Sequence, residues 1–88
     1  MKIRRFLYSS RFERAMAGLG PEYKRLVAER FVIFKDNCFD ARLKTHKLKG
    51  KLFGHWSFSL TYSLRVLFCF TEDNAVIFED VGDHSIYQ

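Results

Sequence analysis

The sequence is poor in cysteine and proline, and it has no long apolar run. Its two cysteines, Cys38 and Cys69, form no CxxC pair and have no histidine pair beside them. Their spacing therefore predicts neither a zinc site nor a disulfide framework, and we expect two partly buried thiols in a reducing compartment. No segment approaches the roughly 20 apolar residues that span a bilayer, and no apolar stretch follows the basic N-terminus. We therefore expect a cytoplasmic protein with no membrane partner.

Acidic residues are scarce over residues 1–51, where fourteen Lys and Arg stand against five Asp and Glu, a net charge of +9. Residues 52–88 reverse the balance, with one Arg against five acids, a net charge of −4. One part of the molecule should therefore attract polyanions while the other does not. Apolar residues make up 48% of the chain and aromatic residues 17%, which argues against disorder. At 88 residues we expect a single domain, residues 1–88.

The first half of the chain predicts a short strand and two helices. Loose alternation indicates a strand through Ile3 and residues 6–8. Ser10, followed three residues later by Glu13, is a capping-box pattern for a first helix that Gly20 ends. Pro21 suits the first position of a second helix, which reaches residues 35–38. The tight joint between the two implies an antiparallel helical hairpin.

The second half predicts three strands, in the alternating segments HWSFSL, RVLFCF and AVIFEDV. Their connections are short enough only for antiparallel hairpins. The predicted fold is α+β, in the order β-α-α-β-β-β, with the helical hairpin packed on one face of a mainly antiparallel four-stranded sheet. We expect the helices to pack on the sheet through their apolar residues at helical spacing, which meet the alternate apolar residues of a central strand. The helix residues are Phe12, Met16, Leu19, Val27, Phe31 and Phe34, and the strand residues are Val66, Phe68 and Phe70.

The first candidate functional feature is the segment RLKTHKLKGK, residues 42–51, whose cations alternate with apolar or small residues around His46. In an extended conformation this alternation would place several cations along one edge, which suits a phosphate backbone. A solvated basic loop fits the composition equally well.

The second feature is Arg65, which shares a predicted strand face with Leu67 and Cys69. It either pairs with a carboxylate, such as Glu79 or Asp80, or presents its guanidinium group to a phosphate.

The third feature is the tail GDHSIYQ, in which His84 and Tyr87 follow the last predicted strand. A histidine can move protons near neutrality, and a tyrosine ring can stack on a base. Terminal residues are commonly frayed, so a disordered tail is the alternative. His55, beside Trp56, indicates a role at the surface or at a sheet edge.

Together, the segment HKLKG, the strand WSFS, the arginine that begins the next strand and the closing GDHSIY resemble the RelE/ParE superfamily of type II toxins. The resemblance is closest to the RelE/YafQ-like mRNA interferase branch and covers nearly the whole chain. It implies a toxin that cleaves mRNA in the ribosomal A site without a metal or other cofactor, the RNA's own 2′-OH attacking the adjacent phosphate. The implied partners are a cognate antitoxin, the ribosome and mRNA, with operator DNA bound only through the antitoxin.

The resemblance also assigns roles to residues of this sequence. Arg65 would stabilise the charge of the phosphorane, and His84 would donate a proton to the leaving 5′-oxygen. His46 would act as a base or as a phosphate ligand. RNA binding would fall to Lys44, Lys47, Lys49, Lys51 and Tyr87. Residues 60–64 lack the further histidine and the acidic residue that some YafQ-like members carry, which leaves the general base open.

Two other functions remain open. ParE-type proteins of the same superfamily poison DNA gyrase and are not nucleases, and the pair of His84 and Tyr87 favours the nuclease branch over them. A nonenzymatic module that binds RNA or the ribosome would use the basic half alone.

Overall fold

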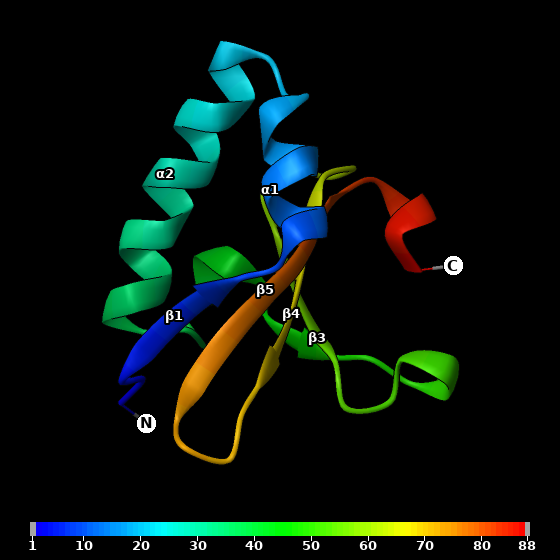
Figure 1. Cartoon of the computed structure of the whole chain (residues 1–88). Coiled ribbons are helices and arrows are strands. Elements are labelled where there is room, and N and C mark those ends of the chain that lie inside the picture. The colour runs from blue at the N-terminus through cyan, green and yellow to red at the C-terminus, as the bar shows by residue number, and fades with distance from the viewer. Residues whose placement is uncertain (1, 88) are drawn as a thin grey trace.

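The computed structural model describes residues 2–87 and has two helices on one face of a five-stranded sheet (Figure 1). The helices are α1 (Ser10–Ala17) and α2 (Pro21–Asp36). The strands are β1 (Arg5–Tyr8), β2 (His46–Lys47), β3 (Trp56–Ser59), β4 (Arg65–Phe70) and β5 (Ala75–Gly82). Three short 3₁₀ helices complete the chain: η1 (Ala41–Leu43), η2 (Gly50–Leu52) and η3 (His84–Tyr87). No helix within residues 2–87 is long and apolar enough to cross a membrane.

The strands lie in the order β1-β5-β4-β3-β2. Strands β3, β4 and β5 form the predicted antiparallel meander, while β1 pairs in parallel with β5. The α+β class, the element order and the helical hairpin are thus confirmed. The predicted count of four strands is one too low, because β2 adds a fifth by pairing antiparallel with β3. A strand of two residues is too short to produce a periodic pattern in the sequence.

The ends of the first helix differ from the prediction. Ser9 is the N-cap, and its Oγ accepts a hydrogen bond of 3.0 Å from the backbone N–H of Phe12. The capping box predicted at Ser10 is therefore wrong, because Ser10 already lies inside the helix. The helix ends at Ala17 rather than at Gly20, and Gly20 instead precedes α2. Pro21 occupies the first turn of α2, as predicted.

Phenylalanine rings fill the space between the helices and the sheet. Phe34 of α2 is fully buried, and its ring centroid lies 5.0 to 5.3 Å from those of Phe58, Phe68 and Phe78. Aromatic pairs at this spacing add to the stability that comes from buried area. The predicted packing is confirmed: Phe12, Val27, Phe34, Val66 and Phe68 are buried, and Met16, Leu19, Phe31 and Phe70 pack against them.

The other side of the sheet, here called the outer face, carries the alternate residues of the central strands. Phe58 lies in the core, so its neighbours Ser57 and Ser59 project to the opposite side. Cys69, between the core residues Phe68 and Phe70, projects there too. In Figure 1, η3 and α2 lie on opposite sides of the sheet, so the C-terminal turn belongs to the outer face.

Candidate nucleic-acid interface and active site

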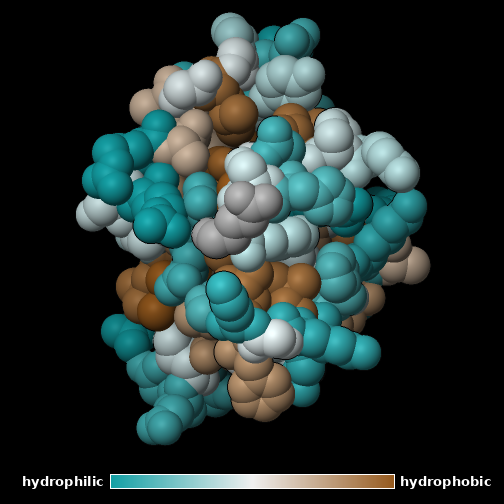
Figure 2. Space-filling model, turned by 90° about the vertical axis from the view of Figure 1, so that its right-hand side faces the viewer, coloured by the Kyte–Doolittle hydropathy of each residue, from teal (hydrophilic) through white to brown (hydrophobic). Residues whose placement is uncertain are grey.

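The C-terminal turn η3 is docked on the outer face rather than frayed. The hydroxyl oxygen of Tyr87 lies 2.7 Å from the Oγ of Ser57, whose side chain is fully buried. Ile86 covers Gly82 so closely that a Cβ there would meet its Cγ2 at 2.8 Å. The ring of His84 packs edge-on against Tyr87, with 5.7 Å between centroids. The two predicted tail residues are therefore held together on this side of the molecule, whose surface is largely hydrophilic with apolar side chains between the polar ones (Figure 2).

Arg65 begins β4, opposite Ser59 of β3. Its Nη1 donates to the Ser59 Oγ at 2.5 Å, and its Nη2 donates to the carbonyl oxygen of Tyr62 at 3.0 Å. Within residues 2–87, its buried Nε has no partner and no carboxylate forms an ion pair with it. Glu79 pairs with His55 instead, and Asp80 accepts from a backbone N–H. The guanidinium charge of Arg65 is thus uncompensated by its described neighbours.

A basic pocket of about 330 Å³ lies beside Arg65 and is also lined by Arg30, Arg42 and Lys44. The buried Nε of Arg30, like that of Arg65, has no partner among the described residues. Arg42 is partly compensated, because its Nε and Nη2 each donate to Asp40 at 2.9 Å. These bonds lower the pKa of the Asp40 carboxyl to about 2. Four cations around one pocket make it suited to a phosphate group.

Two residues of this pocket, Arg30 and Tyr62, were not predicted as site residues. In the sequence, Arg30 lies on the hydrophilic side of a helix and Tyr62 lies in a turn. The structure leaves Tyr62 93% exposed at the pocket. An exposed ring beside cations can stack on a nucleic-acid base. The sequence feature that could have indicated Tyr62 is an aromatic residue placed directly between two polar ones, Thr61 and Ser63.

His46 lies on the same face as the tail. In the pairing of β2 with β3 it stands opposite Ser57, and cross-strand partners project to the same side of a sheet. Ser57 in turn contacts Tyr87. The Nδ1 of His46 lies 3.0 Å from the carbonyl oxygen of Lys44, and the side chain is exposed. The outer face therefore carries all three predicted catalytic residues, with His84 placed there by η3 and Arg65 by its bond to Ser59.

The basic segment does not lie extended along one edge, so of the two alternatives left open by the sequence the structure has the looped one. The turns η1 and η2 interrupt it, and Lys44 has a left-handed backbone with a φ of 52°. Lys44 lines the basic pocket, whereas Lys47 lies on the helix side of the sheet with its Nζ 5.6 Å from the Trp56 ring centroid. Lys49 and Lys51 are exposed in and beside η2. Of the four lysines, only Lys44 therefore lines the basic pocket.

A second polar cluster on the outer face consists of His55, Cys69 and Glu79. The Nε2 of His55 lies 3.0 Å from Glu79, and the Cys69 thiol lies 3.9 Å from the other oxygen of the same carboxylate. The side chain of His55 is 30% exposed, so the surface or sheet-edge role expected for it stays a prediction, to which the structure adds this contact with Glu79. Burial is the main cause that raises the pKa of the Cys69 thiol, and the negative charge of Glu79 raises it further. No motif in the sequence indicates the cluster, because its members come from three separate segments.

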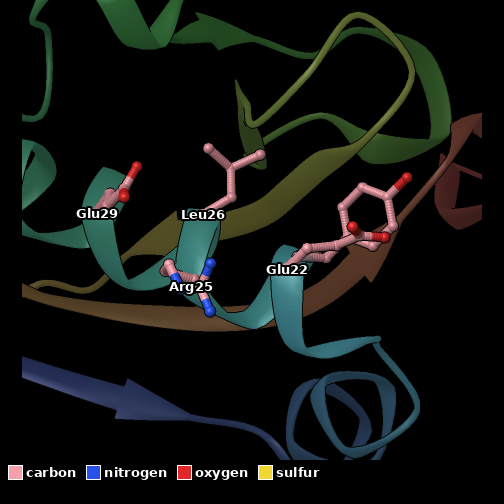
Figure 3. A pocket seen from close by; sticks show the side chains of 5 residues that line it. Glu22, Arg25, Leu26 and Glu29 are labelled. Atoms are coloured by element: carbon pink, nitrogen blue, oxygen red, sulfur yellow. The ribbon is translucent and has the colours of Figure 1, made fainter.

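A separate hollow of about 410 Å³ lies along α2, where Leu26 stands between Glu22 and Glu29 (Figure 3). Its charges are mixed, since Arg25 also lines it. None of the predicted site residues contributes to it. The basic pocket and the outer face therefore remain the candidate site.

Neither a protein-family model nor a curated protein sequence matches the chain. Solved structures do match it. YafQ from E. coli strain BL21(DE3) matches with a TM-score of 0.79 at 16% identity, over 96% of this chain and 97% of that chain. The YoeB/ParE toxin from Agrobacterium tumefaciens matches with a TM-score of 0.78 at 14% identity, over 92% of this chain and 99% of that chain. A chain of the archaeal RelE–RelB complex from Pyrococcus horikoshii OT3 matches with a TM-score of 0.73 at 17% identity, over 94% of this chain and 96% of that chain.

The chain has the RelE-like fold. The match extends over nearly the full length of both partners, so the resemblance seen in the sequence is confirmed at the level of the fold. A shared fold hosts different activities, and at this identity the chemistry has to be argued from the side chains of the site.

Proposed function

We propose that this protein is the toxin of a type II toxin–antitoxin pair and a metal-independent endoribonuclease that cleaves mRNA in the ribosomal A site. One observation carries the proposal. The uncompensated guanidinium of Arg65 borders a pocket of four cations, and the strand partner of Arg65, Gly82, lies against Ile86 of the docked turn η3 that contains His84. The RelE-like fold, shared with proteins described as a toxin or as part of a toxin–antitoxin complex, supports it.

The reaction needs only groups that the RNA and this chain supply. The 2′-oxygen forms a bond to the adjacent phosphorus as the bond to the 5′-oxygen of the next nucleotide breaks, which leaves a cyclic phosphate and a 5′-hydroxyl. A base takes the 2′-OH proton, an acid protonates the leaving oxygen, and a cation stabilises the nonbridging oxygens. We assign the acid to His84, the cation to Arg65 and the base to His46.

The pocket would bind the RNA backbone next to the reacting phosphate. Arg30 and Lys44 would contact phosphate oxygens, while Arg42 stays oriented by Asp40. Tyr62, exposed at the pocket, would stack on an unpaired base, as single-stranded RNA allows. Lys49 and Lys51 would extend the contact along the strand. We assign Tyr87 to orienting His84, because its hydroxyl is already engaged by Ser57.

The proposed protein partner is a cognate antitoxin. The solved relatives include the E. coli DinJ–YafQ toxin–antitoxin complex and the archaeal RelE–RelB complex. An extended acidic or amphipathic segment that folds on binding would neutralise part of the basic surface formed by residues 1–51, whose net charge is +9. Operator DNA would be contacted through the antitoxin.

The test is cleavage of mRNA on programmed ribosomes by the wild type, Arg65→Ala and His84→Ala. Loss of the guanidinium should slow cleavage on the order of 10²–10³-fold, and loss of His84 roughly 10²–10⁴-fold, with ribosome binding kept. Arg14→Ala is the control, because it removes the same charge from an exposed position of α1. EDTA should leave the rate unchanged.

Full activity in both site variants, or cleavage that EDTA abolishes, would contradict the proposed mechanism. A binding module without catalysis would leave the mRNA intact whichever variant is used. A ParE-like protein would also spare the mRNA but would inhibit DNA gyrase, which a supercoiling assay detects.

A further inference from the structure

We propose that His55, Cys69 and Glu79 form a binding site for a divalent transition-metal ion, with Zn²⁺ as the best fit. The three ligand atoms all lie within 4.8 Å of one another. None of the three residues belongs to the proposed catalytic set, so this site does not depend on the proposed nuclease function.

Strand register brings the three residues together. Trp56 pairs with Phe68, so the preceding His55 lies across from Cys69. In β5 the register shifts: Phe68 pairs with Phe78, whereas Leu67 pairs with Asp80. Glu79 is therefore the extra residue of a β-bulge, and such a bulge redirects a side chain. Here the carboxylate of Glu79 reaches both Cys69 and His55 on the outer face.

The ligand set matches the coordination chemistry of zinc. Zinc binds imidazole nitrogen, thiolate sulfur and carboxylate oxygen at about 2.0–2.3 Å in a tetrahedron. Neighbouring ligands in such a tetrahedron lie roughly 3.3–3.7 Å apart. The His55 Nε2 lies 3.0 Å from the Glu79 Oε2, slightly below this range. The Cys69 Sγ lies 3.9 Å from the Glu79 Oε1, slightly above it. Small side-chain rotations would therefore give the required geometry.

The ligand atom that His55 offers is Nε2, which lies 3.0 Å from the Glu79 carboxylate. A neutral imidazole whose proton is on Nδ1 has a free lone pair on Nε2, which is the group that a metal takes. The buried Nδ1 has no hydrogen-bond partner among the described residues. The side chains of His55 and Glu79 are 30% and 34% exposed, so an ion can reach the cluster from solvent.

The three protein ligands leave one position of a zinc tetrahedron open, which is the arrangement of an exchangeable zinc site. Water would supply the fourth ligand at this partly exposed cluster.

A bound ion would join the start of β3 to β4 and β5. Because it binds the folded chain in preference to the unfolded one, it should raise the thermal stability in proportion to the logarithm of its concentration. Chelation should lower the Tm of a zinc-loaded sample while leaving RNA cleavage unchanged. The metal-site proposal and the nuclease proposal can therefore be disproved independently of each other.

The test uses the full chain with Co²⁺ as a spectroscopic probe and Zn²⁺ as a competitor, without RNA. We expect one Co²⁺ per chain, with a thiolate charge-transfer band in the near ultraviolet and the intense visible bands of four-coordinate cobalt. Cys69→Ser should abolish the charge-transfer band. His55→Gln and Glu79→Gln should weaken binding at least about 100-fold, since even the loss of residues that merely orient a ligand costs 10–100-fold. Cys38→Ala, which removes the other thiol, should keep the band.

Circular dichroism identifies any variant that fails to fold, and Glu79→Gln, which keeps the side-chain volume, then carries the test. A charge-transfer band that survives Cys69→Ser, or that disappears in folded Cys38→Ala, would overturn the assignment. So would a Tm that Zn²⁺ leaves unchanged, or an affinity for Co²⁺ that Glu79→Gln does not alter.

Discussion

Small polar side chains decide which groups the outer face holds in place. Ser57 and Ser59 alternate with core aromatics in β3, and each engages one group of the candidate site. The first contacts Tyr87 and the second accepts from Arg65. A serine leaves room above the strand for a turn or a guanidinium group, which a larger side chain would fill. Their alternation was evident in the sequence, but their partners lie 30 and 6 residues away and only the fold shows them.

Tyr87→Phe tests whether one hydrogen bond holds the tail. The change leaves the buried Ser57 Oγ unpaired, so we expect the free energy of unfolding to fall by about 1–2 kcal/mol. Cleavage should also slow, because His84 packs on the same ring. Ser57→Ala combined with Tyr87→Phe should recover part of the loss, since no polar group is then left unpaired. Urea denaturation of the four proteins measures the coupling, and strictly additive losses would contradict the role of this bond.

Asp40 provides a prediction on pH. Its side-chain hydrogen bonds with Arg42 lower its pKa from 3.8 to about 2. Because the folded-state pKa is the lower one, the stabilisation is present above about pH 3.8 and is lost as the pH falls toward 2. Asp40→Asn should therefore be less stable than the wild type near neutrality and equal to it in strong acid. Denaturation at a series of pH values measures this, and an NMR titration midpoint of the Asp40 carboxyl near 3.8 would contradict it.

At the scale of elements, length determined what the sequence could predict. Helix α2 and strands β4 and β5 have 16, 6 and 8 residues, enough for a repeated apolar spacing. Strand β2 has two residues and exists because β3 offers it a partner. A different limit applies to the cluster of His55, Cys69 and Glu79 and to the position of Arg30 at the pocket. Both depend on which strands and helices become neighbours in the fold, and a local sequence pattern does not contain that information. The catalytic roles of His46, Arg65 and His84 come from the family resemblance and stay a prediction, whereas the path of the basic segment became visible only in the fold.

Gly82→Ala tests the docking of η3 as an element. The new Cβ would lie 2.8 Å from the Cγ2 of Ile86, a branched side chain that has little freedom to move away. We expect η3 to be displaced and cleavage to fall while the core stays folded. Gly18→Ala is the matched control, because its Cβ would meet its nearest neighbour at an ordinary 3.6 Å and its φ of −83° suits any residue.

Removing the clash should reverse the effect. Ile86→Ala added to Gly82→Ala takes away the Cγ2 atom and should restore part of the activity. Proteolysis near the C-terminus reports on docking independently of catalysis. Equal activity of Gly82→Ala and Gly18→Ala would show that the position of η3 does not matter for the reaction.

At the scale of the whole molecule, the fold separates the two charge regions of the sequence. The segment with a net charge of −4 supplies the central strands β3, β4 and β5, while the segment with +9 supplies the helices and the loops around them. The cations of the +9 segment are not spread evenly, because three of them, Arg30, Arg42 and Lys44, meet Arg65 of the other segment at one pocket. RNA binding should therefore depend on where a positive charge lies as well as on how many there are.

Two double variants of equal charge separate these contributions. Lys49→Gln with Lys51→Gln removes two exposed charges in and beside η2, and Lys24→Gln with Lys35→Gln removes two from exposed positions of α2. Each phosphate contact with a single strand contributes about 0.7 to the slope of log K against log salt, so losing two contacts should reduce the slope by about 1.4. The α2 pair should change it little, because those side chains lie outside the basic pocket and the η2 loop. Fluorescence anisotropy with a short single-stranded RNA at several salt concentrations measures both slopes. Equal reductions would mean that the RNA responds to net charge alone, and the η2 lysines would then lose their assigned role.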